Sequence, residues 1–386
     1  MKSIYLDNAA TTQLDPEVAD AMIPVLSKVF GNPSSTHAIG RKAKALIETS
    51  RRDISKILGC EPSSIIFTSG GTEADNLALR AAVVDLGCRR IVTSPAEHSA
   101  VIASSEKMSK LFGVELVHVK HFKDGMIDCE NLREILSDGP KTVVSLMHAN
   151  NEIGVIQPLD KISEACKEVG AIFHSDTVQT MAHYSFKLDS LDIDFLACSA
   201  HKFHGPKGTG FLYTHPRNNI NSQIVGGGQE RGLRSGTENL HGIVGLATAI
   251  KLAYKNIDAH TKHVRAIKKH MVEGLKERVE GVEFNGDSDR EDRLYTVLNV
   301  KFPPHQNGGM AMFLLDLEGI CCSGGSACSS GATQGSHVLQ TLGYHDPARA
   351  SLRFSFSRYT TIEEIDVALE AVSRVFCPVK EGISRQ

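Results

Sequence analysis

Short apolar runs alternate with helical stretches between about Asp15 and Ile257, and this alternation constrains the fold more than any other feature of the sequence. Apolar residues recur at helical spacing between the runs, as in 72–84 and 162–169. A strand that is apolar throughout is buried on both faces, which is typical of a parallel sheet covered by helices. We therefore predict a large α/β domain over residues 15–257, with strands at 64–68, 90–93, 142–147, 171–174 and 194–197.

The pattern changes in the last third of the chain, where a smaller α+β domain is predicted from residues 1–14 and 258–386. Residues 351–357 alternate apolar and polar side chains, which predicts a half-exposed strand. Thr361 and Glu364 have the spacing of a capping box, so a last helix is expected to begin there. Its inward face should hold Ile365, Ala368, Leu369 and Val372. A basic stretch is interpreted as the solvated face of a helix: Lys262, Arg265, Lys268, Lys269 and Lys276.

The charge of the chain is nearly balanced, with 42 Lys and Arg against 45 Asp and Glu. Neither sign dominates, which argues against a dedicated binder of nucleic acid or of anionic membranes. No apolar run approaches the roughly 18 residues of a membrane span, and the first residues do not form a signal peptide. We expect a cytoplasmic protein without direct nucleic-acid or membrane partners.

Nine cysteines form no CxxC pair, so neither a zinc ribbon nor a thioredoxin-like site is expected. An odd number of thiols without the spacing of a secreted scaffold favours a reducing compartment. Most of these thiols should be buried and serve as small apolar fillers.

Two constellations could bind ligands at the ends of predicted strands. The segment 69–73 (SGGTE) joins a strand to a helix, and its glycines and free amides could approach an anion, although an ordinary strand-to-helix turn is the simpler interpretation. Asp176 and Gln179 follow another strand, in the crevice where ligands of such sheets bind. The carboxylate could pair with a cationic ring nitrogen or cap a helix, and both interpretations stay open.

Two further constellations carry candidate nucleophiles. Lys202 comes just past an apolar strand and before the glycine-rich 205–210, where a desolvated amine could form a Schiff base. The alternative is a surface lysine. Cys328 lies among residues 323–331, which are all small, and a mobile exposed loop of this kind suits a nucleophilic thiol. Cys321 and Cys322 are predicted to be strand residues.

Eight motifs occur in one order along the chain: YLDNAATT (5–12), GNPSSTH (31–37), FTSGGTEADN (67–76), EH (97–98), NNEIG (150–154), SAHK (199–202), RGLRSGT (231–237) and GSAC (325–328). Together they resemble the cysteine desulfurases of the NifS/IscS type, from about residue 4 to about 375. These are pyridoxal-phosphate (PLP) enzymes of the class-V aminotransferase family. The resemblance implies the fold-type I architecture, with a mostly parallel seven-stranded sheet in the large domain.

The resemblance also implies a role for each residue that matches a family motif. Lys202 would hold PLP as a Schiff base, Asp176 would pair with the pyridine nitrogen, and His98 would stack on the ring and handle protons. Asn151 and Gln179 would lie near the ring's 3-oxygen. The phosphate ligands would be Gly71, Thr72, Ser199 and His201, with Thr237 lent by a second subunit of a homodimer. The substrate contacts would be Arg353 on the carboxylate, together with Asn151 and Asn32, and His37 lies in the same segment as Asn32.

Cys328 matches the nucleophile of the family. Its thiolate would take the sulfur of L-cysteine as a persulfide and release L-alanine. The long spacing from Cys328 to His337 resembles the NifS/IscS group more than the SufS-like group, with a mobile cysteine loop at about 321–336. Direct transfer to an IscU- or NifU-like scaffold for iron–sulfur cluster assembly would follow, with Cys328 as a transient cluster ligand and no resident metal.

Three alternatives belong to other classes of function. A fold-type I transaminase or lyase would use Lys202 but not Cys328. A selenocysteine lyase would differ only in the chalcogen of its substrate. A metal-binding or iron–sulfur regulatory module would use Cys321, Cys322, Cys328 and His337 and would have no enzymatic activity.

Overall fold

The computed structural model describes residues 3–324 and 335–376 of the chain. A seven-stranded sheet dominates it, in the order β2-β8-β7-β6-β5-β3-β4. Strands β4, β3, β5, β6 and β7 pair in parallel, whereas β8 runs antiparallel to both β2 and β7. Its strands are β2 (Ile65–Thr68), β3 (Arg90–Thr93), β4 (Glu115–His118), β5 (Thr142–Ser145), β6 (Ile172–Asp176), β7 (Phe195–Ser199) and β8 (Gly210–Thr214). The mostly parallel seven-stranded sheet is thereby confirmed.

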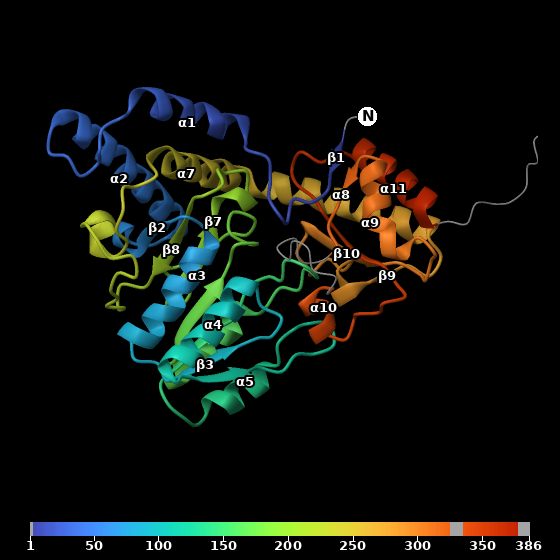
Figure 1. Ribbon diagram of the computed structural model, residues 1–386, viewed down its shortest axis with the longest axis horizontal. Coiled ribbons are helices and arrows are strands. Elements are labelled where there is room, and N and C mark those ends of the chain that lie inside the picture. The colour runs from blue at the N-terminus through green and yellow to red at the C-terminus, as the bar shows by residue number, and fades with distance from the viewer. Residues whose placement is uncertain (1–2, 325–334, 377–386) are drawn as a thin grey trace, which may run out of the picture.

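Both faces of this sheet are covered by helices, as the continuous apolar strands predicted (Figure 1). Neighbouring residues of one strand enter different cores, since Val143 packs with the residues of one face and Val144 with those of the other. One face packs against α3 (Gly71–Arg80) and α4 (Ser99–Phe112). The other packs against α1 (Pro16–Lys28), α2 (Ala38–Leu58), α5 (Cys129–Leu136), α6 (Leu159–Val169) and α7 (Leu240–Lys255).

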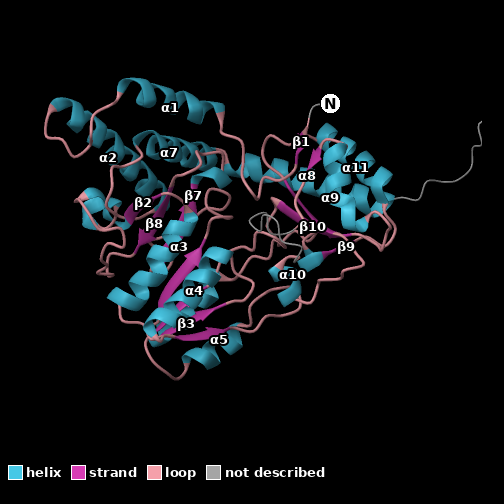
Figure 2. Cartoon of the chain, viewed as in Figure 1, coloured by secondary structure: helices cyan, strands magenta, loops and turns pink. Residues whose placement is uncertain are grey.

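A second group of elements lies beside the large sheet (Figure 2). An antiparallel sheet has the order β12-β10-β9, and β1 pairs in parallel with β11. The strands are β1 (Ile4–Tyr5), β9 (Glu283–Phe284), β10 (Val297–Lys301), β11 (Ile320–Cys321) and β12 (Ser351–Ser355). The helices are α8 (Ile257–Arg278), α9 (Ala311–Leu317), α10 (His337–Thr341) and α11 (Ile362–Phe376). Their core joins Leu6 to residues of α8, β10, β12 and α11.

The start of α11 confirms the predicted capping box. The Thr361 amide donates to the Glu364 carboxylate over 3.1 Å, and the Glu364 amide donates to Thr361 Oγ1 over 3.2 Å. The four residues predicted to face inward are buried: Ile365, Ala368, Leu369 and Val372. In the ranges 3–324 and 335–376 we find no helix long and apolar enough to cross a membrane.

Two predictions about exposure are wrong. Strand β12 was expected to be half-exposed, but Arg353 and Ser355 on its polar face are both buried, because residues 6–9 lie across them and hydrogen-bond to Ser355. Lys268 was assigned to the solvated face of α8, but only 5% of it is exposed and its Nζ donates to the Leu294 carbonyl over 3.1 Å. Helical periodicity could not predict this burial, because the Lys268 side chain extends over the edge of the helix to a carbonyl group of a neighbouring loop.

Candidate active site

A cavity opens where the parallel strands of the large sheet end. The structure brings together there most of the residues that sequence reasoning selected: Gly71, Thr72, His98, Asn151, Asp176, Gln179, Ser199, His201, Lys202 and Arg353. Parallel strands end at the same edge of a sheet, so residues from distant parts of the chain meet at this place. Ala9, Ala10 and Thr11 of the first motif complete one wall.

Lys202 lies in a 3₁₀ turn, Ala200–Lys202, directly after β7. Its Nζ donates hydrogen bonds to the carbonyl oxygens of Ala9 and Ala10, over 2.7 and 2.8 Å. The turn is tight because Gly205 packs against Ala200, where a Cβ would approach the Ala200 carbonyl oxygen to 2.8 Å. The sequence therefore presents the amine to the cavity from a rigid strand end, and the interpretation as a surface lysine is wrong.

Asp176 is the last residue of β6, whereas the sequence placed it two residues beyond the strand. Its Oδ1 accepts a hydrogen bond from the Val178 amide over 2.8 Å. Burial raises the pKa of Asp176, while His98, the Val178 amide and Lys202 act in the opposite direction. A cation facing this carboxylate would stabilise its ionised form.

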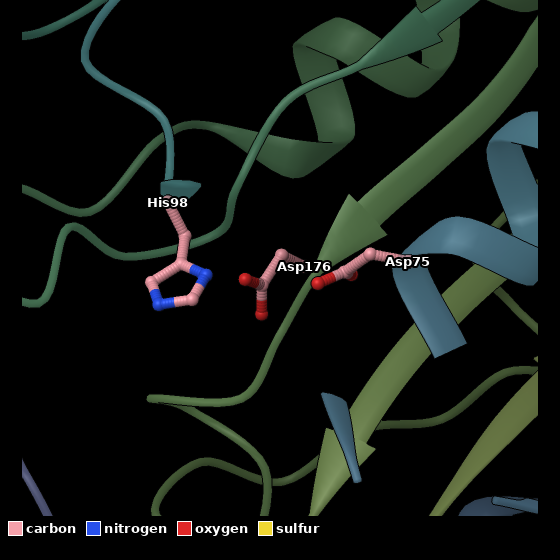
Figure 3. Close-up of side chains that lie close together, drawn as sticks. All are labelled: Asp75, His98 and Asp176. Atoms are coloured by element: carbon pink, nitrogen blue, oxygen red, sulfur yellow. The ribbon is translucent and has the colours of Figure 1, made fainter. Parts of the chain in front are cut away.

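His98 faces Asp176 from the start of α4 (Figure 3). Its Nδ1 accepts a hydrogen bond from the Ala100 amide over 3.2 Å. In the neutral ring the proton is then on Nε2, because an accepting nitrogen carries none. One possible ligand atom from each of His98, Asp176 and Asp75 lies within 4.8 Å of the other two.

Asp75 is a buried carboxylate that sequence reasoning missed. It is on the buried face of α3, among alanines and leucines, and this charged residue on an apolar face was the signal available in the sequence. Burial, Asp176 and Glu97 all raise the pKa of Asp75 well above its ordinary value. Glu97 is itself buried, which raises its pKa, although the Met147 amide donates to it.

The start of α3 forms the anion-binding side of the cavity. Gly70 has a φ of 155°, and the helix begins at Gly71. A Cβ at Gly71 would lie 2.5 Å from Val178 Cγ2, so only glycine fits at this position. The free amides of a helix N-terminus and the hydroxyls of Thr72 and Ser199 suit a phosphate group.

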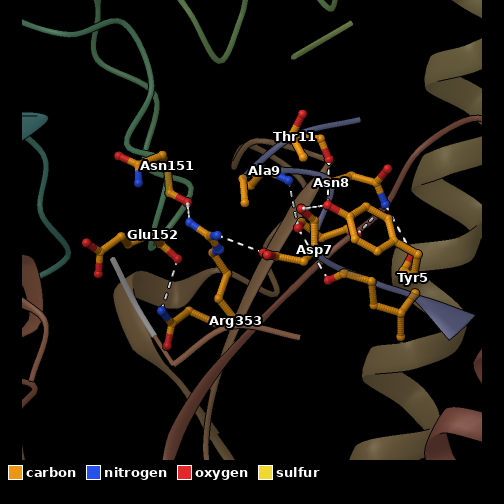
Figure 4. A network of polar contacts seen from close by, with 12 residues as sticks. Tyr5, Asp7, Asn8, Ala9, Thr11, Asn151, Glu152 and Arg353 are labelled. Atoms are coloured by element: carbon orange, nitrogen blue, oxygen red, sulfur yellow. Dashed lines mark hydrogen bonds and ion pairs between the residues drawn. The ribbon is translucent and has the colours of Figure 1, made fainter. Parts of the chain in front are cut away.

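Strand β12 carries Arg353, whose side chain lines the cavity. Figure 4 shows its guanidinium between two partners: Nη1 donates to the Asn151 carbonyl over 3.0 Å, and Nη2 donates to Asp7 Oδ1 over 2.9 Å. Asp7 belongs to the first sequence motif, but its pairing with Arg353 was not predicted. The two residues are 346 positions apart in the chain.

Asn32, His37 and Thr237 do not line this cavity. Asn32 Oδ1 accepts from the Ser34 amide over 2.9 Å, and His37 caps α2 through the Gly40 amide. The segments that carry Asn32 and Thr237 contact each other, because Gln229 bonds to both Ser34 and Gly236. They therefore form a separate surface of the same subunit.

Cys328 lies outside the described residues, as does Cys377. Of the described cysteines only Cys88, Cys166 and Cys198 are buried, so the expectation that most are buried is not met; the partly exposed ones are Cys60, Cys129, Cys321 and Cys322. Within residues 3–324 and 335–376, Asp75, His98 and Asp176 form the single group of three possible metal ligands, and Cys321, Cys322 and His337 form none.

The whole chain is similar to known enzymes. Residues 4–368 match the family "Aminotransferase class-V". Cysteine desulfurase IscS of Dictyoglomus turgidum is 39% identical over 97% of this chain and 94% of its own length, and a cysteine desulfurase of Cereibacter sphaeroides is 42% identical over 96% and 95%. A solved NifS-like protein superimposes with a TM-score of 0.87 at 35% identity, over 97% of this chain and 99% of its own. The chain therefore belongs to the class-V aminotransferase family, and within it to the cysteine desulfurases.

Proposed function

We propose that this enzyme takes the sulfur of L-cysteine onto Cys328 as a persulfide and releases L-alanine. The observation that carries the proposal is that residues on both sides of segment 325–334 are at the cavity, through bonds to Arg353 and Glu152 and through His337, which lines it. Ser323 exchanges two backbone hydrogen bonds with Arg353, over 3.1 and 2.6 Å. Beyond the segment, the Ser336 hydroxyl donates to the Glu152 carboxylate, and His337 Nε2 donates to the Glu97 carbonyl over 2.9 Å.

The cavity fits the cofactor on which class-V enzymes depend. The start of α3, with Gly71 and Thr72, would hold the phosphate of PLP, and Lys202 would hold its aldehyde. Asp176 would face the ring nitrogen, and this pairing provides the cation that the buried carboxylate needs. When bound, PLP would supply an electron sink for the carbon atoms of the substrate.

The residues of this chain would divide the remaining work. Arg353 binds the carboxylate of L-cysteine, and Lys202 and His98 move protons between the substrate carbon atoms and solvent. The Cys328 thiolate attacks the substrate sulfur. A sulfur–sulfur bond forms as the bond between sulfur and the substrate β-carbon breaks, and that carbon keeps the electron pair and takes a proton to complete L-alanine.

We also propose a homodimer in which Thr237, and with it Asn32, reaches the cavity of the partner. Both lie outside the cavity of their own subunit. Nearby surfaces on α1, just after it, and on the loop before Gln229 expose large apolar side chains that a second copy would cover: Ile23, Leu26, Phe30 and Val225.

The partner that accepts the sulfur is proposed to be an IscU- or NifU-like scaffold in the cytoplasm, where thiols stay reduced.

We further propose two domains, residues 15–257 and residues 1–14 with 258–386. Two separate hydrophobic cores support this division, one built from residues 18–253 and the other from residues 4–6 and 264–376.

The experiment compares the purified enzyme with Cys328→Ala and Lys202→Ala. With L-cysteine, the parent should produce equal amounts of L-alanine and sulfide, measured with dithiothreitol as the final acceptor. Cys328→Ala should keep the visible PLP band and lose sulfide release, whereas Lys202→Ala should lose the covalently bound cofactor. Unchanged sulfide release by Cys328→Ala, a 2-oxo acid product, a strong preference for selenocysteine, or stoichiometric metal without PLP would each contradict the proposal.

A further inference from the structure

Asp7 and Arg353 form an ion pair at the wall of the cavity, but only Arg353 is among the residues that line it. Arg353 lines the cavity and is 1% exposed, whereas Asp7 lies behind it and its side chain is 19% exposed. The third guanidinium nitrogen, Nε, is buried without a hydrogen-bond partner among the described residues. The guanidinium therefore rests against fixed protein groups, while Arg353 is part of the cavity lining.

Asp7 is held in place by its own segment. The hydroxyl of Tyr5 donates to the carbonyl oxygens of Asp7 and Thr11, over 3.1 and 2.8 Å, which fixes the turn between them. The next residue, Asn8, donates from Nδ2 to the Ser355 carbonyl over 2.9 Å. Because Ser355 and Arg353 are on the same strand, the carboxylate cannot drift away from the guanidinium without breaking these bonds.

The same segment also binds the second cation of the site. The Ala9 and Ala10 carbonyls accept from Lys202 Nζ, and Gln179 Nε2 donates to the Ala9 carbonyl over 3.1 Å. Residues 5–12 thus contact both the proposed substrate anchor and the cofactor lysine. Only Asp7 supplies a full negative charge to this segment.

We propose that Asp7 is a positioning residue that lowers the affinity of Arg353 for carboxylates. The product L-alanine, which carries the same carboxylate as L-cysteine, then dissociates readily. The proposal rests on the function proposed above, in which Arg353 binds the substrate carboxylate. Substrate and product carry the same carboxylate, so an unopposed buried guanidinium would retain both. A carboxylate that is already paired with the guanidinium lowers the gain from binding another one.

The matched variants are Asp7→Asn and Asp7→Glu. Asparagine keeps an oxygen acceptor at Oδ1 and removes the charge, whereas glutamate keeps the charge. In titration calorimetry of the holoenzyme, Asp7→Asn should bind L-alanine about tenfold more tightly than the parent. Asp7→Glu should stay within about threefold of the parent. Ethylamine, which has no carboxylate, should bind all three proteins equally.

Steady-state measurements give a second readout. The KM for L-cysteine and the inhibition constant of L-alanine should fall together in Asp7→Asn, while kcat falls because product release becomes slower. Equal or weaker binding of L-alanine by a folded Asp7→Asn protein would overturn the proposal. If Asp7→Asn does not fold, L-alanine binding by Asp7→Glu that is tenfold tighter than by the parent would overturn it instead.

Arg353→Gln separates this proposal from the function on which it rests. If Arg353→Gln binds L-alanine as tightly as the parent, Arg353 is not the carboxylate anchor and the proposed function is wrong in that respect. If Arg353→Gln loses L-alanine binding but Asp7→Asn does not gain it, only the role of Asp7 is wrong.

Discussion

His174 Nε2 lies 3.4 Å from Oδ1 of Asp75, and both side chains are fully buried. Burial lowers the pKa of His174 to about 3, so this ring is neutral at any physiological pH. Its Nδ1 pairs with the Ser145 hydroxyl over 2.8 Å. The neutral ring gives Asp75 no positive charge to pair with, and burial, together with the negative charges of Asp176 and Glu97, raises the pKa of Asp75.

The first prediction concerns this buried carboxyl group in the apo-protein. A carboxyl group with a raised pKa binds its proton more tightly in the folded state, so it costs stability as the pH rises above its unfolded value of about 4. Asp75→Asn has no proton to lose there. The free energy of unfolding of the apo-protein should then fall less steeply with pH, by up to about 1.4 kcal/mol per pH unit.

Urea unfolding of the apo-protein between pH 5 and pH 8 measures this slope. Asp138→Asn, at an exposed position, is the control and should reproduce the parental slope. Parallel curves for Asp75→Asn and the parent would show that Asp75 is ionised in the folded apo-protein.

The second prediction concerns Lys268. Burial lowers its pKa to about 7, with Arg265 and Arg293 also disfavouring the charge and Asp289 and Asp292 favouring it. The unfolded chain binds this proton up to about pH 10, so Lys268 costs stability at and below pH 7, and the cost disappears as the pH rises toward 10. Lys268→Met should raise the free energy of unfolding by about 2 kcal/mol at pH 7, with no gain near pH 10.

The check for Lys268→Met is chemical unfolding at both pH values. Lys269→Met, at the exposed neighbouring position, is its control and should change stability by less than about 0.5 kcal/mol. A Lys268→Met protein less stable than the parent at pH 7 would mean that the hydrogen bond to Leu294 outweighs the burial of the amine.

The third prediction concerns the buried ion pair of Arg51 and Glu230. The two side chains are each 2% exposed and form two hydrogen bonds of 2.8 Å, and the Phe67 amide also donates to Glu230. Glu230 and Arg231 have positive φ values of 46° and 59°, and the ion pair with Arg51 stabilises this unfavourable backbone conformation. Glu230→Gln leaves the buried guanidinium with only the more exposed Glu48 as a charged partner, at 3.4 Å, and should cost about 3 kcal/mol.

Thermal and chemical unfolding test the ion pair. Glu164→Gln breaks the exposed pair with Arg133 and should cost less than about 1 kcal/mol. Similar losses in the two variants would contradict the dominant role of burial.

The fourth prediction concerns the space at the start of α3. Gly71→Ala puts a methyl group into Val178, which must move, and the helix start moves with it. The affinity for PLP should fall about tenfold or more, because the amides then miss the phosphate. Equilibrium dialysis of PLP against the apo-protein measures this loss. Gly309→Ala, where nothing lies within 4 Å of the added Cβ, should bind PLP like the parent.

The sequence predicted those parts of the fold that depend on local pattern. Buried strands such as β5 and β7 are apolar on both faces, and this alone indicates a covered parallel sheet. The position of the site could be predicted because the carboxyl ends of parallel strands lie at the same edge of a sheet. Asp176 and Lys202 follow two such strands, and both line the cavity.

What the sequence did not reveal depends on segments that are far apart in the chain. The alternation in β12 is that of a half-exposed strand, and only the segment at residues 6–9 turns its polar face into buried surface. For the same reason the pairing of Arg353 with Asp7 could not be inferred from spacing. Periodicity describes one element at a time and does not tell which other segment covers it.

The pairing of β1 with β11 has a consequence for synthesis on the ribosome. Ile4 and Tyr5 are among the first residues to emerge, but their partners Ile320 and Cys321 emerge more than three hundred residues later. The bond from Asn8 to Ser355 spans 347 positions. A nascent chain therefore exposes an incomplete cavity during most of its translation, and the side that carries Arg353, the proposed substrate anchor, is added only when nearly the whole chain has been made.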